Sequence, residues 1–405
     1  MRRRVVVTGM GAVSPFGCGV LRMMAGLNEG QCALSFIPET QKIPGIDCHV
    51  AGMVPALAEA RDIPREYRRT MSPMTIFACL AAREAIAQAN FSQGLPARSG
   101  VSIGSTMGSG QELHSLFSSF IVSGTLDAVR TMAFFKIMAH TASAGVAALF
   151  GLSGRILNPV AACAAGLQGI GAAFEAIAFG REDRMLCGGT EEYSPLTCAT
   201  FDKIGAASHG HDPEQASRPF DKRRDGIVCS EGAGILILEE RGQALARGAS
   251  ILAEIAGYAT VTSPASVASP DEQSSARCME EALADAGADP GAVAYVNAHA
   301  TATHAGDVAE GRAIERIWGN RVPVSSLKGH MGHAMAASGA LETVACIEMM
   351  RSGRIVAGRN GLVPDPECGQ LWHAEQGQTL DRGLVVKNSF ALGGIYASLV
   401  LAPAE

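Results

Sequence analysis

The amino-acid sequence predicts an α/β protein that is built from two similar halves. Its 405 residues are 47% hydrophobic and 18% charged, which suits one large α/β unit or two fused halves and excludes a disordered chain. Short aliphatic runs alternate with segments rich in alanine and glycine, and no linker or low-complexity segment separates them. The order strand, polar residue at a turn, small-residue helix occurs once in each half. We therefore expect a boundary near residue 250, with residues 1–250 and 251–405 as two halves packed into one body.

The first half begins with a short buried strand, Val5–Val7, and we expect Thr8–Gly11 to form a glycine turn after it. A glycine pair here hints at a dinucleotide-binding loop. The third small residue of that fingerprint is missing and Pro15 opposes a helix, so a nucleotide site is disfavoured. Aliphatic runs and helical apolar spacing predict the other elements of this half. They are a helix at Met71–Asn90, strands at Val101–Ser105 and Ile156–Val160, a helix from Cys163 to Phe179, and strands at Met185–Thr190 and Gly234–Glu239.

The second half repeats part of this pattern. It begins with an aliphatic strand at Ile251–Ala259, which is similar to the first strand of the chain. A strand at Val322–Ser326 then leads through the polar turn Lys328–His330 into a helix at Ala334–Met350. This order matches the segment from Ile156 to Phe179, and the match is the reason for expecting two similar halves.

Composition and charge exclude several classes of protein. A net charge of −6 argues against a protein that binds nucleic acid over a whole face, because such proteins are basic. Two long uncharged stretches, Ile137–Gly154 and Ile156–Phe174, are interrupted by polar residues, a proline and several glycines, so we expect buried core and no membrane span. The basic N-terminus precedes only three apolar residues, so no secretory signal is expected. The 11 cysteines are then cytosolic thiols, and the expected location is cytoplasmic.

Cys163 is the first candidate for chemistry. It follows a strand and precedes a helix rich in alanine and glycine. A helix N-terminus favours the thiolate, because its free N–H groups and dipole stabilise negative charge. A buried cysteine also serves as a small apolar core residue, and position alone leaves both interpretations open.

Two further polar clusters follow predicted strands in the second half. The first contains His299, and an extended backbone would point Thr301 and Thr303 to one side of it. The second contains Lys328 with two histidines at 330 and 333. That histidine spacing could suit a metal, but no acidic or cysteine partner stands nearby in the sequence, so no metal and no cofactor are expected. A cysteine with histidines and a lysine at strand ends suits a nucleophile with electrophilic helpers.

With these residues in place, the chain resembles an elongating β-ketoacyl-acyl carrier protein synthase of the thiolase-like condensing-enzyme superfamily. The resemblance covers nearly the whole length and implies a layered αβαβα fold. Each motif alone is weak, but all of them in this order are specific. The motifs are Val5–Gly11, Ala162-Cys163, Phe220-Asp221, Arg224-Asp225-Gly226, Glu231–Gly234, His299-x-Thr301-x-Thr303 with Gly306-Asp307, Lys328, Gly332-His333, Asn388–Phe390 and Gly393-Gly394.

The resemblance implies a role for each residue of the predicted site. Cys163 would take an acyl chain from a carrier-protein thioester. His299 and His333 would then hydrogen-bond the thioester carbonyl of a malonyl unit and stabilise the enolate that decarboxylation leaves. Lys328 would tune these histidines electrostatically. Backbone N–H groups of Cys163 and Leu392 would form the oxyanion hole for the acyl-enzyme.

Supporting residues are implied in the same way. Thr301 and Thr303 correspond to the hydroxyls that bind pantetheine, and Asp307 and Glu310 to structural support. The residues that line the acyl pocket and its gate would be Phe201, Met107, Phe390 and Leu392.

The resemblance also implies partners. Acyl carrier proteins are acidic, and Arg65, Arg68 and Arg69 form a basic cluster where the family docks them. A solvated loop face is the plain alternative for this cluster. The family further implies a dimer, either of two copies or with a ketosynthase-like chain-length subunit.

The match departs from the family at the gate. The loop Ala391-Leu392 carries an alanine and an aliphatic residue where the family has glycine and an aromatic one, and Ile395-Tyr396 replaces a polar pair. Ile227 also replaces a phenylalanine, and Ala300 and His304 replace a glycine and a proline near the histidine. Since the nucleophile is untouched, we expect a reshaped acyl gate. This favours a specialised type II pathway that makes a polyene, a polyketide-like chain or a nodulation-type signal.

Two other interpretations fit the sequence less well. A non-catalytic chain-length subunit would keep the fold and lose the nucleophile, whereas Cys163 and both histidines are present here. A thiolase acting on coenzyme A esters would carry a second cysteine near the C-terminal glycine loop, and Asn388–Gly394 contains none. A decarboxylative Claisen condensation is therefore the predicted reaction.

Overall fold

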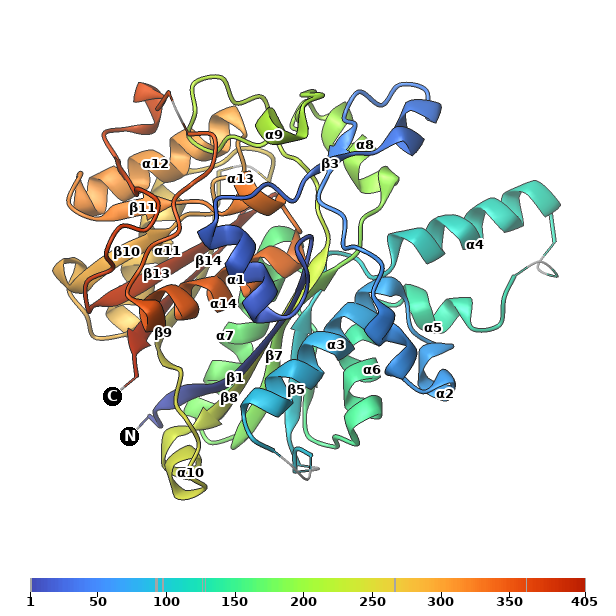
Figure 1. The fold of residues 1–405 in the computed structure, drawn as a ribbon, viewed down its shortest axis with the longest axis horizontal. Coiled ribbons are helices and arrows are strands. Elements are labelled where there is room, and N and C mark those ends of the chain that lie inside the picture. The colour runs from blue at the N-terminus through green and yellow to red at the C-terminus, as the bar shows by residue number, and fades with distance from the viewer. Residues whose placement is uncertain are drawn as a thin grey trace.

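The computed structural model describes residues 2–404 except 92, 93, 97, 126, 128, 266 and 362. Within these residues the chain forms the predicted α/β fold, in which the helices cover one mixed sheet (Figure 1). A search of the described part finds no helix that is both long and apolar enough to cross a membrane.

The first half contributes the following strands and helices, in chain order: β1 (Val5–Ser14), β2 (Gly17–Cys18), α1 (Val20–Asn28), β3 (Ser35–Phe36), β4 (Val50–Ala51), α2 (Arg65–Arg68), α3 (Pro73–Gln88), β5 (Gly100–Gly104), α4 (Gly110–Ser123), α5 (Ala133–Ile137), α6 (Thr141–Phe150), β6 (Ile156–Leu157), α7 (Ala165–Ala178), β7 (Arg184–Glu191), α8 (Pro195–Lys203), α9 (Pro213–Ala216), β8 (Gly232–Glu240) and α10 (Arg241–Ala246).

The second half contributes β9 (Ala253–Thr262), α11 (Glu272–Asp285), β10 (Val293–Asn297), α12 (His304–Trp318), β11 (Pro323–Ser325), α13 (Lys328–Met331), α14 (Ala336–Ser352), β12 (Trp372–His373), β13 (Leu384–Ala391) and β14 (Ile395–Pro403).

The two halves share one strand pattern. The sheet runs β12-β11-β10-β13-β14-β9-β1-β8-β7-β5-β6, and the antiparallel pair β1–β9 joins the halves at its centre. On either side of this pair the same order of pairings occurs: two antiparallel pairs, followed by two parallel pairs. The strand pairing therefore bears out the internal repeat that the sequence indicates.

The helices form layers around the strands. α7 and α14 pack against each other and lie between the two halves, where they contact β7, β8 and β13 (Figure 1). α3 and α6 cover the outer side of the first half, and α11 and α12 cover that of the second. This order of layers brings the N-terminal ends of α7 and α14 together near the middle of the molecule.

The predicted glycine turn at Thr8–Gly11 is wrong, because β1 continues without a break from Val5 to Ser14. The two glycines serve helix packing instead. A Cβ atom at Gly9 would collide with the carbonyl oxygen of Ala85 in α3, and one at Gly11 with the carbonyl oxygen of Ala81. Glycine thus lets α3 lie directly on the strand.

The other predicted elements form with shifted ends. The strand expected at Ile156–Val160 has only two residues, Ile156–Leu157, and proline at 159 interrupts its pairing. The helix expected from Cys163 begins at Ala165, and a 3₁₀ turn, Ala162–Ala164, comes before it. Cys163 therefore lies on a tight turn and not in the first turn of an α-helix.

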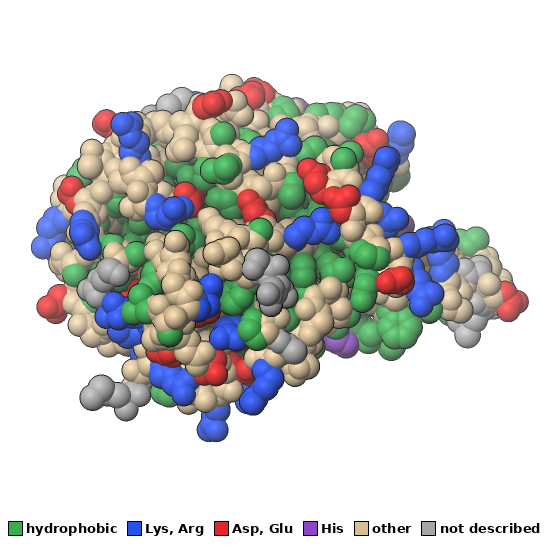
Figure 2. All heavy atoms as spheres, turned by 60° about the horizontal axis from the view of Figure 1, so that its bottom comes forward, with side chains coloured by type: hydrophobic (Ala, Val, Ile, Leu, Met, Phe, Trp, Pro, Cys, Tyr) green, Lys and Arg blue, Asp and Glu red, His purple; other side chains and the backbone are tan. Residues whose placement is uncertain are grey.

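An arm made of α4 and α5 projects from the body (Figure 1). Several of its apolar side chains are exposed, with Val122 at 88% and Ile121 at 75% exposure. On the face seen in Figure 2, positive and negative side chains are interspersed over the body, and hydrophobic ones gather where the arm joins it. The arm is therefore an apolar surface that the described chain leaves uncovered.

Candidate active site

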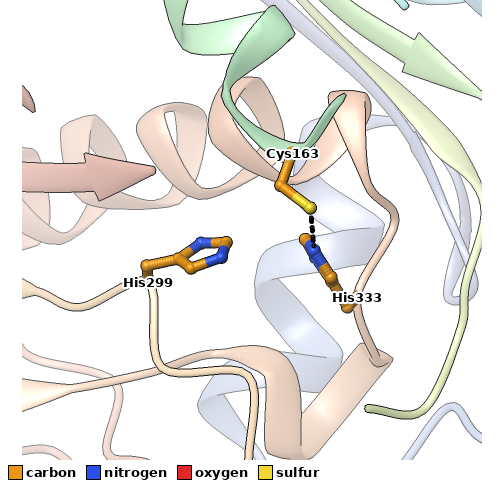
Figure 3. A group of neighbouring side chains, drawn as sticks. All are labelled: Cys163, His299 and His333. Carbon is orange, nitrogen blue, oxygen red and sulfur yellow. Dashed lines mark hydrogen bonds between the residues drawn. The ribbon is translucent and has the colours of Figure 1, made fainter. Parts of the chain in front are cut away.

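Cys163 lies on the 3₁₀ turn that precedes α7, and its side chain is buried. Ala162, immediately before it, has φ of 46°, in the left-handed region that residues with a Cβ rarely adopt. Such strain persists only where the surrounding structure holds it, and it is common next to reacting groups. The turn aims the thiol at two histidines from the other half of the chain (Figure 3).

His333 reaches the thiol from the connection between α13 and α14. Its backbone N–H donates to the carbonyl of Val228 at 2.8 Å, and its carbonyl accepts from Ser230 at 2.9 Å. Its ring Nε2 lies 2.9 Å from Sγ of Cys163 (Figure 3). Its Nδ1 lies 3.0 Å from the Ser338 hydroxyl. Both ring nitrogens are therefore engaged, and the ring orientation is determined.

His299 follows β10 directly and stands beside His333. The two ring centroids are 5.2 Å apart, with the planes nearly perpendicular. Glu310 of α12 holds the segment by accepting from the backbone N–H groups of His299, at 2.8 Å, and Ala300, at 2.7 Å. The ring Nδ1 of His299 is buried without a hydrogen-bond partner among the described residues. A buried polar atom of this kind at a cavity suits a ligand.

Lys328 lies behind the histidines in a fully buried ion-pair network. Its Nζ is 2.7 Å from Oε1 of Glu342, and Nζ of Lys387 is 2.8 Å from the other oxygen, Oε2. Sequence reasoning missed Glu342 and Lys387. The available signal was one ionisable residue inside each of two apolar runs, the helix Ala336–Cys346 and the strand Val385–Val386 with the residue after it.

Burial dominates the ionisation of the site. It raises the pKa of the Cys163 thiol to about 12, while Lys328 lowers this pKa and Glu191 raises it. The helix N-terminus that the sequence indicates therefore does not by itself yield a thiolate. Burial also lowers the pKa of His299 and of His333 well below the ordinary value, and Lys328 is the next cause for both rings. At neutral pH the site holds a thiol and two neutral imidazoles.

A cavity opens onto Cys163, His299 and His333. Its lining is mainly apolar, with a few convergent polar groups, as in most small-molecule sites. Of the residues implied by the resemblance, the following line it: Thr301, Thr303, Phe201, Phe390, Leu392 and Glu310. Ile227, Ala391 and Tyr396, three of the departures from the family pattern, line it too.

Thr301 and Thr303 face the cavity together, and their hydroxyl oxygens lie 3.2 Å apart. The backbone between them is not extended, however, because Ala302 has φ of 68°. Asp307 explains this bend. One of its oxygens accepts from the Ala302 N–H at 3.1 Å and the other from Phe220 N–H at 2.8 Å.

The gate loop Leu392–Gly394 connects β13 to β14. Gly393 and Gly394 have φ of 97° and 71°, which glycine adopts without strain. Leu392 at its tip is 42% exposed and touches the cavity mouth. Met107 is 51% exposed and does not contribute to the cavity lining formed by the described residues.

The basic cluster lies on and beside α2. Arg65 and Arg69 are exposed, whereas Arg68 is half-buried and its guanidinium donates to the Ala60 carbonyl at 3.1 Å. Two of the three arginines are thus available to a partner.

The donor atoms of Cys163, His299 and His333 lie within 4.8 Å of one another, and in the described parts of the chain this is the one group that could hold a metal. Such donors suit zinc. Two ammonium groups lie behind them, and their positive charge disfavours a divalent cation there. His330, the other histidine of that segment, faces two backbone carbonyls at 3.0 and 2.9 Å and takes no part.

Two known domain families match most of the chain. The β-ketoacyl synthase N-terminal domain matches residues 2–244, and the β-ketoacyl synthase C-terminal domain matches residues 252–361. A 3-oxoacyl-[acyl-carrier-protein] synthase 2 from Staphylococcus aureus is 35% identical over 419 residues, which covers 100% of this chain and 99% of the relative. Its counterpart from Synechocystis is 36% identical over 406 residues, 97% of this chain and 96% of the relative.

Solved structures agree in fold. A β-ketoacyl synthase from Burkholderia phymatum superposes with a TM-score of 0.96 at 38% identity, and each chain is covered completely. A type II polyketide ketosynthase, solved with its acyl carrier protein and a bound hexaketide, gives 0.91 at 31% identity with complete coverage of both chains. The ishigamide ketosynthase/chain length factor gives 0.91 at 32% identity, also with complete coverage.

These relatives confirm the thiolase-like fold that the resemblance implies. They also confirm the predicted class of enzyme, because acyltransferase condensation is what 3-oxoacyl-acyl carrier protein synthases carry out. The chain belongs to the β-ketoacyl synthase family.

Proposed function

We propose that this chain condenses an acyl group held on Cys163 with malonyl-acyl carrier protein, releasing carbon dioxide and a β-ketoacyl-acyl carrier protein. The observation that carries the proposal is the convergence of one thiol and two neutral imidazoles on a single apolar cavity. A neutral imidazole still carries one N–H group, which can donate a hydrogen bond to the thioester carbonyl oxygen and to the enolate oxygen that forms from it.

In the first step the thiol loses its proton, with Nε2 of His333 in reach of it at 2.9 Å. The sulfur attacks the acyl thioester, a new C–S bond forms, and the carrier-protein thiol leaves with a proton. In the second step His299 and His333 hydrogen-bond the malonyl thioester oxygen while carbon dioxide leaves. The enolate carbon then attacks the Cys163 thioester and expels the cysteine sulfur as a thiolate, which takes a proton from solvent to restore the thiol. Backbone N–H groups of Cys163 and Leu392 are the proposed oxyanion hole for that attack.

The supporting residues take the roles that the resemblance implies. Thr301 and Thr303 bind the pantetheine arm from one wall of the cavity. Phe201 and Phe390 line the acyl pocket and Leu392 its gate, with Met107 assigned there from the resemblance alone. Asp307 and Glu310 hold the histidine segment through backbone N–H groups.

An acyl carrier protein is the proposed partner, docked through Arg65 and Arg69 with Arg68 beside them. A second ketosynthase-type chain is the other, as a homodimer or a heterodimer with a chain-length subunit. The exposed apolar arm supports the second partner, because single chains rarely leave such a surface uncovered. The division at residue 250 and the cytoplasmic location stay predictions.

The gate supports a specialised type II pathway. Ile227 and Leu392 stand on the cavity where the resemblance implies aromatic side chains, so the acyl chain meets branched aliphatic groups. A polyene, polyketide-like or signal-type acyl group is the proposed substrate.

Intact-protein mass spectrometry tests this function. The protein, its Cys163→Ala variant and its His333→Ala variant are incubated with a set of acyl-carrier proteins, and malonyl-carrier protein is then added. We expect one acyl mass on the wild type, none on Cys163→Ala, and on His333→Ala a more slowly formed acyl mass that malonyl-carrier protein does not discharge. Normal elongation by His333→Ala would refute the assigned role of that residue.

A further inference from the structure

Lys387 is a second buried ammonium group beside the site. It lies on β13, in the interior of the sheet between β10 and β14, and its exposure is 0%. Alternation along the strand gives Lys387 and Ser389 the face toward α14. Asn388 between them faces α12, where its side-chain amide donates to Glu310 at 3.0 Å. One short stretch of β13 thus touches both supports of the histidine pair.

Lys387 shares its carboxylate partner with a second lysine. Its Nζ lies 2.8 Å from Oε2 of Glu342 and also donates to the Asn388 carbonyl. Lys328 already pairs with the other oxygen of Glu342, at 2.7 Å. Two ammonium groups therefore flank the carboxylate of Glu342, and the buried carboxyl of Glu310 is the next acidic group near both of them.

Burying a second ammonium group is costly. A single lysine would already pair with Glu342, whereas the second one adds the desolvation of another ammonium ion. Pairing with Glu342 alone therefore does not account for Lys387. Its role is better sought in the field that its charge makes at the neighbouring groups.

We propose that Lys387 is a positioning residue of the condensation step: its positive charge, held beside that of Lys328 by Glu342, acts on His299 and His333 and stabilises the negative charge that develops on the thioester oxygen between them. This inference rests on the proposed function and names the residue that sets the electrostatics of its second step.

The groups that face Lys387 come from several elements. They are Glu342 and Cys346 on α14, Lys328 on α13, Glu310 on α12, and His299 and His333 in the adjoining loops. Burial comes first, and Lys328 and Lys387 then both lower the pKa of each histidine. The charges that act on the Cys163 thiol are those of Lys328 and Glu191. The influence of Lys387 is thus directed at the histidines and not at the nucleophile.

Three substitutions separate charge from shape. Lys387→Met removes the charge and the hydrogen bond to the Asn388 carbonyl, Lys387→Gln removes the charge and keeps an N–H donor, and Lys387→Arg keeps the charge. Cys346→Ala is the matched control, because it alters packing beside Glu342 and leaves all three charges in place. If Lys387→Met does not fold, Lys387→Gln answers the same question.

The readouts are decarboxylation of malonyl-carrier protein at neutral pH and its pH profile, acylation of Cys163, and NMR titration of the histidine rings. For Lys387→Met and Lys387→Gln we expect kcat of decarboxylation to fall about tenfold with KM unchanged, since the negative charge develops only in the transition state. We also expect the acid limb and the ring titrations to move to higher pH, and acylation to stay within about twofold of the wild type. The variants Lys387→Arg and Cys346→Ala should behave like the wild type.

Lys387→Gln kinetics and titrations equal to those of the wild type would overturn the proposal. So would a decarboxylation loss in Cys346→Ala as large as that in Lys387→Met, which would assign the effect to packing. A wild-type protein that does not decarboxylate malonyl-carrier protein would instead refute the proposed function. In that case the ring titrations still decide whether Lys387 acts on the histidines.

Discussion

Nε2 of His333 lies 2.9 Å from Sγ of Cys163, although the two residues are 170 positions apart in the chain. The contact exists because the turn before α7 and the connection before α14 meet between the two halves of the molecule. It places a neutral imidazole on a thiol whose pKa burial raises to about 12. Ionisation of the nucleophile therefore depends on its neighbours more than on its own helix.

The first prediction concerns Glu191, a buried carboxyl at the end of β7. Its negative charge raises the pKa of Cys163, so Glu191→Gln should lower that pKa. Alkylation of the thiol by iodoacetamide at a fixed pH should then be a few times faster, because the thiolate is the reacting species. Cys163→Ala measures the background from the other cysteines. A slower or unchanged rate in Glu191→Gln would show that its charge does not reach the thiol.

The second prediction concerns stability against pH. Burial raises the pKa of Glu191 from 4.5 to about 7. Between these values the folded protein holds the proton and the unfolded chain does not, so the free energy of unfolding falls as pH rises, and above about 7 the loss is complete. Thermal unfolding should show a larger fall in Tm from pH 5 to pH 7 for the wild type than for Glu191→Gln. Parallel curves for the two proteins would contradict the raised pKa.

The third prediction concerns the gate. Leu392→Phe should shift the preferred acyl length, because a rigid ring at the cavity mouth takes space that a branched aliphatic side chain leaves free. The loading rates of Cys163 with a series of acyl-carrier proteins measure the shift. Leu392→Met, which conserves volume, is the control and should keep the wild-type profile. An identical profile in Leu392→Phe would remove Leu392 from the gate.

The fourth prediction concerns docking. Arg65→Glu combined with Arg69→Glu should raise KM for acyl-carrier protein about tenfold and weaken its salt dependence, while turnover of a small pantetheine thioester stays unchanged. Arg181→Glu combined with Arg382→Glu, at exposed sites in the turn after α7 and just before β13, is the matched control for net charge. An equal rise of KM in both proteins would mean that total charge matters and not this cluster.

The fifth prediction concerns the packing of α3 on β1. Gly9→Ala should destabilise the protein by about 1–3 kcal/mol, since its Cβ would collide with the Ala85 carbonyl and the helix must shift. Urea denaturation measures the change. Gly291→Ala is the control, because a Cβ there meets open space. Equal stability of the two variants would contradict the close approach.

Local pattern in the sequence was enough to predict most elements and the reacting groups. Aliphatic runs and helical spacing depend on near neighbours, and they place α3, β5, β7, β8 and α14 within a few residues of their observed ends. Cys163, His299 and His333 stand where predicted strands end, so their motifs could be recognised without knowing the fold. The internal repeat was visible for the same reason.

Only the tertiary structure decided how these groups meet and what charge they carry. β1 runs through its glycines because α3 packs on them, which no local pattern shows. The raised pKa of Cys163 follows from burial by distant segments, and Lys387 becomes part of the site only because β13 passes α14 at Glu342. Burial and long-range charge arise from the packing of segments far apart in the chain, so they are properties of the fold and not of any stretch of sequence.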